Sequence, residues 1–162
     1  MKRIAINGFG RIGRILFRIL NENTDYQIVA INDLASPKVL SHLLKYDSIH
    51  GRYHREVTFL HDSIFVDGKK IIISNIKETR QLNWRELNID IVFECTGLKK
   101  SFRSNFEHIS AGAKKVILSS PPNDEKINMI VLGVNDHLIN QSDQVISNAS
   151  CTTNCAAPMI KV

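Results

Sequence analysis

The chain has 162 residues, 43% of them hydrophobic and 23% charged, with a formal net charge of +5. This length suits one domain with a buried core, and no apolar run is long enough to span a membrane. Three cysteines argue against a secreted disulfide scaffold, and the scattered basic pairs argue against a nucleic-acid surface. We therefore expect a cytoplasmic protein that lacks a signal peptide and binds neither nucleic acid nor a membrane.

Short apolar runs alternate with amphipathic segments along the first 45 residues. We expect strands at 2–7 and 27–33, a helix at 12–20, and a second helix that opens at Pro37 and ends near Lys45. This β-α-β-α order is typical of a parallel sheet. The apolar residues that share one face of the first expected helix are Ile12, Ile15, Leu16, Ile19 and Leu20.

The middle of the chain has a different pattern. The segments 56–60, 63–66 and 70–74 are strand-like, and Asp67-Gly68 is a strong hairpin-turn signal. Further strands are expected at 89–94, 115–119, 129–132 and 144–147, with helices at 101–110 and from Cys151 onward. The predicted fold class is α/β: a Rossmann-type, doubly wound, mostly parallel sheet with an antiparallel hairpin excursion.

A glycine motif joins the first expected strand to the first expected helix. Gly8, Gly10 and Gly13 match the pattern G-x-G-x-x-G, in which a tight turn and close backbone approach leave room for a dinucleotide diphosphate. Asp33 ends the next strand, where a carboxylate would accept hydrogen bonds from the ribose hydroxyls and disfavour the 2′-phosphate of NADP. The alternative is a purely structural turn, with Asp33 capping the helix near Pro37. The context favours dinucleotide binding, with NAD as the cofactor.

The stretch SNASCTTNC, residues 147–155, contains two of the three cysteines. Two cysteines that are four residues apart on one helix have poor geometry for a disulfide bond. No second Cys/His pair has the spacing of metal ligands, so we expect no metal site. Two buried cysteines remain an alternative. The second alternative is that Cys151 is a nucleophile. Ser150 would cap a helix that begins at Cys151, where free backbone amides stabilise a thiolate. Cys155, one turn deeper, would then be a buried structural residue.

The chain resembles the N-terminal, NAD-binding half of a phosphorylating glyceraldehyde-3-phosphate dehydrogenase. The stretches that carry the resemblance are NGFGRIGR at 7–14, AINDL at 30–34, YDSIHG at 46–51, ECTG at 94–97, AGAKKV at 111–116 and SNASCTTNC at 147–155. They occur in the family's order and cover nearly the whole chain. The resemblance implies a substrate that is a phosphorylated aldehyde, with inorganic phosphate as co-substrate, and a homotetramer when full length.

The resemblance also implies roles for individual residues. Cys151 matches the nucleophile that forms a thioester, and Ser150 and Thr152 match positions that help to hold the attacking phosphate. The positions that match the lining of the dinucleotide site are Phe9, Gly10, Arg11, Ile12, Asp33, Lys77, Thr96 and Ser119. One departure is Lys99, which stands where the family usually has an aromatic residue near the adenine.

The family's complete subunit has a second half, which carries the general base and the substrate-phosphate grip. We therefore expect residues 1–150 to form the NAD-binding Rossmann domain and residues 151–162 to be the truncated start of the catalytic domain. The chain by itself is expected to be inactive. The alternatives to a glyceraldehyde-3-phosphate dehydrogenase are erythrose-4-phosphate dehydrogenase and a non-catalytic NAD-binding module.

Overall fold

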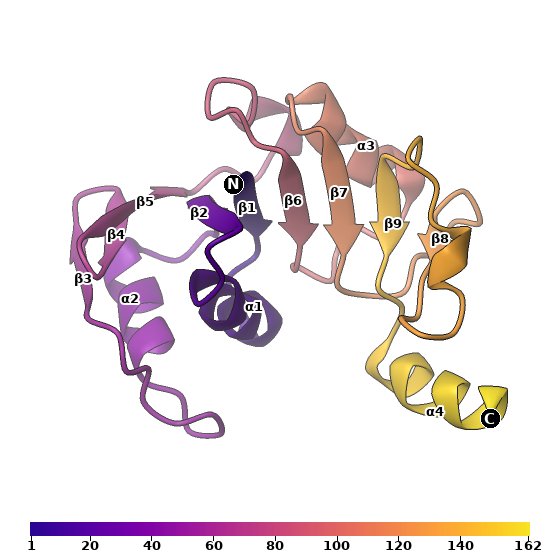
Figure 1. Cartoon of the computed structure of the whole chain (residues 1–162). Coiled ribbons are helices and arrows are strands. Elements are labelled where there is room, and N and C mark those ends of the chain that lie inside the picture. The colour runs from indigo at the N-terminus through magenta and orange to yellow at the C-terminus, as the bar shows by residue number, and fades with distance from the viewer.

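The structure is a computed structural model that describes residues 1–162. Its strands form one nine-stranded sheet in the order β3-β4-β5-β2-β1-β6-β7-β9-β8 (Figure 1). The strands are β1 Lys2–Asn7, β2 Tyr26–Asn32, β3 Val57–Leu60, β4 Ser63–Val66, β5 Lys69–Ser74, β6 Ile91–Glu94, β7 Lys115–Leu118, β8 Asn128–Met129 and β9 Val145–Ser147. The helices are α1 Arg11–Asn21, α2 Pro37–Lys45, α3 Phe102–Ser110 and α4 Cys151–Lys161, with short 3-10 helices at Thr79–Gln81 and Asp136–Leu138.

The topology confirms the predicted fold class. β1 lies between β2 and β6 and pairs in parallel with both, and β7 pairs in parallel with β6 and β9. The expected excursion is present, because β3 pairs antiparallel with β4, β4 pairs antiparallel with β5, and β5 rejoins the parallel sheet beside β2. Asp67 and Gly68 turn the β4–β5 hairpin, both with positive φ, as a two-residue hairpin loop requires.

Helices cover the two faces of the sheet. Phe17 of α1 and Leu40 of α2 belong to one buried cluster with Ile6 of β1. Trp84 belongs to a second cluster with Val116 of β7, which α3 covers from the opposite face. α4 projects from the carboxyl side of the sheet and has no buried residue (Figure 1). No helix of the structure is long and apolar enough to cross a membrane.

The apolar face predicted for α1 is correct at Leu20, which is buried, and at Leu16, which packs against the buried cluster, but it is wrong at Ile12 and Ile19. The residues that α1 buries are Gly13, Phe17 and Leu20, whereas Ile12 is 55% exposed and Ile19 is 63% exposed. The helix takes this rotation because the Phe17 ring packs edge-on against Phe9, with ring centroids 5.7 Å apart. Ile12 is therefore left at the surface where the strands end.

The strand expected at 129–132 is also largely wrong, since β8 contains only Asn128 and Met129. The backbone N–H of Val131 donates to the side-chain Oδ1 of Asn135 at 2.7 Å instead of to a neighbouring strand. An asparagine that binds local backbone competes with the sheet and turns the chain. The apolar residues Ile130 and Val131 are buried as the pattern indicates, but they lie between the end of β8 and the turn that begins at Leu132.

Candidate dinucleotide site

Four neighbouring strands of the sheet each end at a polar residue on the carboxyl edge. β1, β2 and β6 end at Asn7, Asn32 and Glu94, and β5 ends at Ser74. These residues are in register, because Asn7 lies opposite both Asn32 and Glu94, and Asn32 lies opposite Ser74. Ligands of open α/β sheets bind beyond this edge. Most of the predicted site residues lie in the loops that leave it.

The three glycines of the motif have different reasons to be glycine. Gly8 has φ +90, and a Cβ there would lie 2.7 Å from the backbone N of Thr96. A Cβ on Gly13 would lie 2.2 Å from the carbonyl oxygen of Gly8. Gly10 has no such neighbour, since a Cβ there would meet nothing within 4 Å. The fold therefore accounts for Gly8 and Gly13, and it leaves an open space over Gly10.

The glycine motif predicts that a diphosphate binds in this open space. Gly10 is the N-cap of α1 and its position supplies no side-chain hydrogen bond to the first turn. The amide groups of that turn are thus available, and the helix dipole favours a negative charge there. Arg11, the next residue, is exposed and adds a positive charge at the same end.

Asp33 is tied to the glycine loop. Its Oδ2 accepts a hydrogen bond from the backbone N of Phe9 at 2.7 Å, and its Oδ1 accepts one from the backbone N of Ala35 at 2.9 Å. The alternative role for Asp33 as the cap of α2 is wrong, because Ser36 is the N-cap of that helix. A carboxylate has about four acceptor positions, so two remain for ribose hydroxyls.

Phe9, Lys77 and Thr96 lie in three different loops at this edge. Phe9 as a whole is 1% exposed and its backbone N donates to Asp33, so this residue shapes the loop from within and offers almost no surface to a ligand. Lys77 is exposed and follows Ile76, whose backbone N donates to Asn32 Oδ1 at 2.9 Å. Thr96 donates through its backbone N to Glu94 Oε1 at 2.8 Å, and its hydroxyl donates to the same oxygen.

Ile12 and Ser119 line a separate cavity of about 390 Å³ at the same edge, together with Asn148. Asn148 donates through its backbone N to the carbonyl oxygen of Leu118 at 2.9 Å, which holds the loop after β9 beside the loop after β7. The structure thus brings two of the predicted dinucleotide residues next to the cysteine stretch. Lys99 does not join either group, because its Nζ lies 3.7 Å from Glu107 Oε2 on α3.

The cysteine stretch forms the helix start that was predicted. Ser150 is the N-cap of α4, and its Oγ accepts from the backbone N of Thr153 at 3.0 Å. The hydroxyls of Ser150 and Thr152 are 2.9 Å apart. Cys151 is the first residue of the helix and is exposed. Ala149, which precedes the cap, is buried with φ +57, a backbone conformation that costs a non-glycine residue about 1–2 kcal/mol.

The expectation that Cys155 is a buried structural residue is wrong, because Cys155 is exposed. The reason is that α4 packs no residue into the core. The least accessible cysteine is Cys95, next to Glu94 at the end of β6, and burial raises the pKa of its thiol to about 12. A thiol with that pKa stays protonated and is a poor nucleophile.

Sequence reasoning missed a buried polar cluster beneath the site. Glu94 and His108 are 1% and 0% exposed, and His108 Nε2 lies 3.1 Å from Glu94 Oε2. The indole of Trp84 donates to His108 Nδ1 at 2.9 Å. The sequence does contain a signal for this cluster, since three apolar strands each end at a polar residue, at positions 7, 32 and 94.

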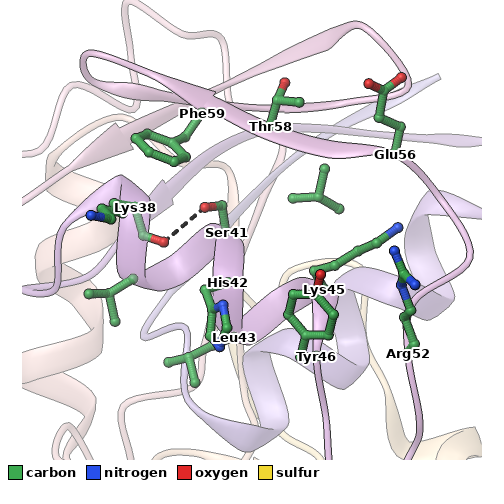
Figure 2. A pocket seen from close by; sticks show the side chains of 12 residues that line it. Lys38, Ser41, His42, Leu43, Lys45, Tyr46, Arg52, Glu56, Thr58 and Phe59 are labelled. Atoms are coloured by element: carbon green, nitrogen blue, oxygen red, sulfur yellow. Dashed lines mark hydrogen bonds between the residues drawn. The ribbon is translucent and has the colours of Figure 1, made fainter.

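The largest groove of the molecule lies elsewhere, between α2 and β3, with a volume of about 890 Å³ (Figure 2). Lys38, His42 and Tyr46 line it from the helix side, and Phe59 from β3. It contains none of the predicted site residues. Its hydrogen bond from Ser41 Oγ to the Lys38 carbonyl is internal to α2. We therefore place the candidate site at the carboxyl edge and not in the largest groove.

Comparison with known proteins finds a family model and many relatives that share this part of the chain. The family model described as the glyceraldehyde 3-phosphate dehydrogenase NAD binding domain matches residues 2–102. A glyceraldehyde-3-phosphate dehydrogenase of Mycoplasma pneumoniae is 48% identical over 160 residues, which is 99% of this chain and 48% of the relative. Glyceraldehyde-3-phosphate dehydrogenase 2 of Bacillus subtilis is 51% identical over 99% of this chain and 47% of its own length. A cytosolic glyceraldehyde-3-phosphate dehydrogenase of Trypanosoma brucei brucei is 46% identical over the same share of this chain. The chain spans about half the length of these relatives.

Proposed function

Because this chain belongs to the glyceraldehyde-3-phosphate dehydrogenase family and contains its NAD-binding domain, we propose that it supplies the cofactor site and the nucleophile for an NAD-dependent, phosphorylating oxidation of glyceraldehyde 3-phosphate. The product of that reaction is 1,3-bisphosphoglycerate. The observation that carries the proposal is that Cys151, exposed at the start of α4, follows a loop that lines the same cavity as Ile12 and Ser119. The nucleophile and the cofactor residues therefore meet at one edge of the sheet.

NAD, when bound, supplies the hydride acceptor for this chemistry. The Cys151 thiolate adds to the aldehyde carbon, and the oxidised product stays on its sulfur as a thioester. An oxygen of inorganic phosphate then attacks the thioester carbon, and the thiolate leaves as the acyl phosphate forms. In this proposal the hydroxyls of Ser150 and Thr152 hold that phosphate, which is supported by their position 2.9 Å apart at the N-terminus of α4.

The site holds its charges in a way that suits these anionic ligands. The first turn of α1 offers amides and Arg11 to the diphosphate, and the first turn of α4 offers amides and hydroxyls to the phosphate. We also propose that residues 1–150 are the cofactor domain and that 151–162 open the catalytic domain. A cytosolic location and a homotetramer are part of the same proposal, the former also matching the name of the Trypanosoma brucei brucei relative.

A chimera tests the activity. Residues 1–162 of this chain are joined to the remaining half of the Bacillus subtilis relative, which is 51% identical over the shared part. With NAD and inorganic phosphate, we expect the chimera to form NADH from glyceraldehyde 3-phosphate, and to do so faster than from erythrose 4-phosphate. The Cys151→Ser chimera, which keeps the size and cap geometry of this position, is expected to bind NAD and form no NADH.

Three results would contradict the proposal. If the chimera folds and binds NAD but oxidises neither aldehyde, this half of the protein does not serve a dehydrogenase. A clear preference for erythrose 4-phosphate replaces the proposed substrate with the alternative one. A Cys151→Ser chimera with full activity would remove Cys151 from the role of nucleophile.

A further inference from the structure

Side chains at the carboxyl edge form a continuous row of hydrogen bonds across four strands. We call Ser74, Asn32, Asn7 and Glu94 the edge ladder, in the order of strands β5, β2, β1 and β6. Ser74 Oγ donates to Asn32 Oδ1 at 3.0 Å, Asn32 Nδ2 donates to Asn7 Oδ1 at 2.7 Å, and Asn7 Nδ2 donates to Glu94 Oε2 at 2.5 Å. Each member is the last residue of its strand, so each one controls how the following loop leaves the sheet.

Glu94 anchors one end of the edge ladder. Its side chain is 1% exposed and accepts four hydrogen bonds. Asn7 and His108 Nε2 donate to one oxygen, and the backbone N and hydroxyl of Thr96 donate to the other. Burial alone would raise the pKa of this carboxyl, but the hydrogen bonds from His108, Thr96 and Asn7 outweigh it and lower the pKa. Glu94 is therefore an ionised acceptor.

The histidine beside Glu94 is neutral. An indole N–H can only donate, so the hydrogen bond from Trp84 Nε1 requires His108 Nδ1 to be the unprotonated nitrogen. The remaining proton is on Nε2 and is donated to Glu94. The buried carboxylate is thus held by neutral donors, and a buried acceptor of this kind is costly if even one donor is lost.

The edge ladder connects the loops that carry the predicted cofactor residues. Asn7 precedes Gly8, and Gly8 packs so closely on Thr96 that a Cβ would lie 2.7 Å from the Thr96 backbone N. Asn7 and Thr96 are also the two residues that donate to opposite oxygens of Glu94. The Glu94 carboxylate therefore holds the loop after β1 and the loop after β6 together through hydrogen bonds.

We propose that Glu94 is a positioning residue for NAD: it fixes the separation between the glycine loop and the Thr96 loop, and so sets the width of the diphosphate cradle over Gly10. This inference rests on the proposed cofactor site. Glu94 does not touch the ligand itself, because it lies beneath the loops, 1% exposed. It acts through Asn7 and Thr96.

The position demands a carboxylate and not merely a side chain of the same shape. Glu94→Gln would put an –NH₂ group in place of one oxygen, and that group would face either Asn7 and His108 or Thr96, all of which donate. His108 cannot switch its tautomer to accept, because Trp84 already donates to Nδ1. A purely space-filling role predicts that Glu94→Gln is tolerated, whereas a positioning role predicts that the two loops separate.

The test compares Glu94→Gln with Val116→Ala in this chain. Val116 is 0% exposed in β7 on the α3 side of the sheet, and it makes no contact with the edge ladder through hydrogen bonds. Hydrogen exchange without ligand, and NAD binding by calorimetry, are measured beside thermal unfolding. Thr96→Val is a second and milder variant if Glu94→Gln fails to fold, because it removes the hydroxyl that donates to Glu94 and accepts from the backbone N of Leu98 but keeps the backbone N–H that donates to Glu94.

For Glu94→Gln we expect amide exchange at 8–12 and 95–97 to rise about tenfold, and NAD to bind about tenfold more weakly, as the loss of one buried hydrogen bond implies. Thr96→Val is expected to show the same pattern with a change of about threefold. Val116→Ala is expected to lower the unfolding temperature while leaving both loop exchange and NAD affinity within about twofold of the native chain. The positioning role is overturned if amide exchange at these loops stays native in both Glu94→Gln and Thr96→Val. It is also overturned if exchange rises as much in Val116→Ala. Native protein that fails to bind NAD overturns the proposed cofactor site instead, and the exchange measurement still decides the role of Glu94.

Discussion

The backbone N of Phe9 donates a hydrogen bond of 2.7 Å to Asp33 Oδ2, which ties the glycine loop after β1 to the end of β2. Asp33 thus has two duties. It shapes the loop that we expect to face the diphosphate. We also expect its remaining acceptor positions to bind the ribose hydroxyls and so to favour a cofactor without a 2′-phosphate.

The first prediction concerns cofactor choice. A 2′-phosphate beside the Asp33 carboxylate would bring two negative charges together, so the native chain should bind NAD at least tenfold more tightly than NADP. Asp33→Asn should weaken NAD binding and narrow that ratio, because the amide removes the repulsion and one of the acceptor oxygens. Calorimetric titration of both cofactors measures the effect. Asp25→Asn, which changes the same charge at an exposed position outside the site, should leave the ratio unchanged. An unchanged ratio in Asp33→Asn would show that Asp33 does not select the cofactor.

The second prediction compares the structural roles of Gly13 and Gly10. Gly13→Ala should destabilise the fold by about 1–3 kcal/mol, because the new Cβ would lie 2.2 Å from the Gly8 carbonyl oxygen and the backbone has to move. Gly10→Ala should cost less than about 1 kcal/mol, since its Cβ meets nothing and its φ of −71 suits alanine. Urea unfolding followed by the fluorescence of Trp84, the single tryptophan, measures both. Equal losses of stability in the two variants would mean that the close approach of Gly13 to Gly8 is not a constraint.

The third prediction concerns acid stability. The pKa of Glu94 is below its ordinary value of 4.5 in the folded protein, so its ionised form stabilises the fold above that pH, and this contribution is lost as pH falls through the folded pKa. The native chain should therefore lose free energy of unfolding more steeply below pH 4.5 than Glu94→Gln does. Urea midpoints measured across the acid range give both slopes. Carboxylates outside the edge ladder, such as Asp47, titrate in both proteins and cancel in the comparison. Parallel curves would contradict an ionised, hydrogen-bonded Glu94.

The fourth prediction concerns the three thiols. Iodoacetamide at neutral pH should label Cys151 and Cys155, which are exposed, and should spare Cys95, whose pKa is raised to about 12 by burial. Peptide mass spectrometry after a short exposure gives the three rates. Labelling in urea provides the control, because Cys95 should react once the sheet unfolds. Rapid labelling of Cys95 in the native state would contradict the packing at the end of β6.

Much of this fold could be predicted from the sequence because the signals were local. Residues 2–7 and Pro37 to Lys45 carry their strand and helix patterns within themselves, and the structure has these elements at the predicted bounds. The turn at Asp67-Gly68 and the Ser150 cap are likewise set by residues that act on their immediate neighbours. The order of the glycine motif, strand and acid also predicts a site at the carboxyl edge of the sheet, where the structure brings these elements together.

The errors came from contacts between distant segments. The rotation of α1 depends on how Phe17 meets Phe9 and how Gly13 meets Gly8, and no apolar count along the helix contains that information. The exposure of Cys155 depends on what covers α4, and the end of β8 depends on one side chain, Asn135. The edge ladder joins residues that are 25 and 87 positions apart in the chain, so the pairing becomes visible only once the strands are aligned.

Binding of NAD over Gly10 is the property on which the proposed function depends, and it can be measured in this chain. NAD is titrated into the native chain and into Gly10→Ala, with unfolding followed on the same samples. We predict that Gly10→Ala keeps its fold and binds NAD at least tenfold more weakly, because the new Cβ fills the open space that the diphosphate needs. Equal NAD affinity in a folded Gly10→Ala chain, or no NAD binding by the native chain, would contradict the account.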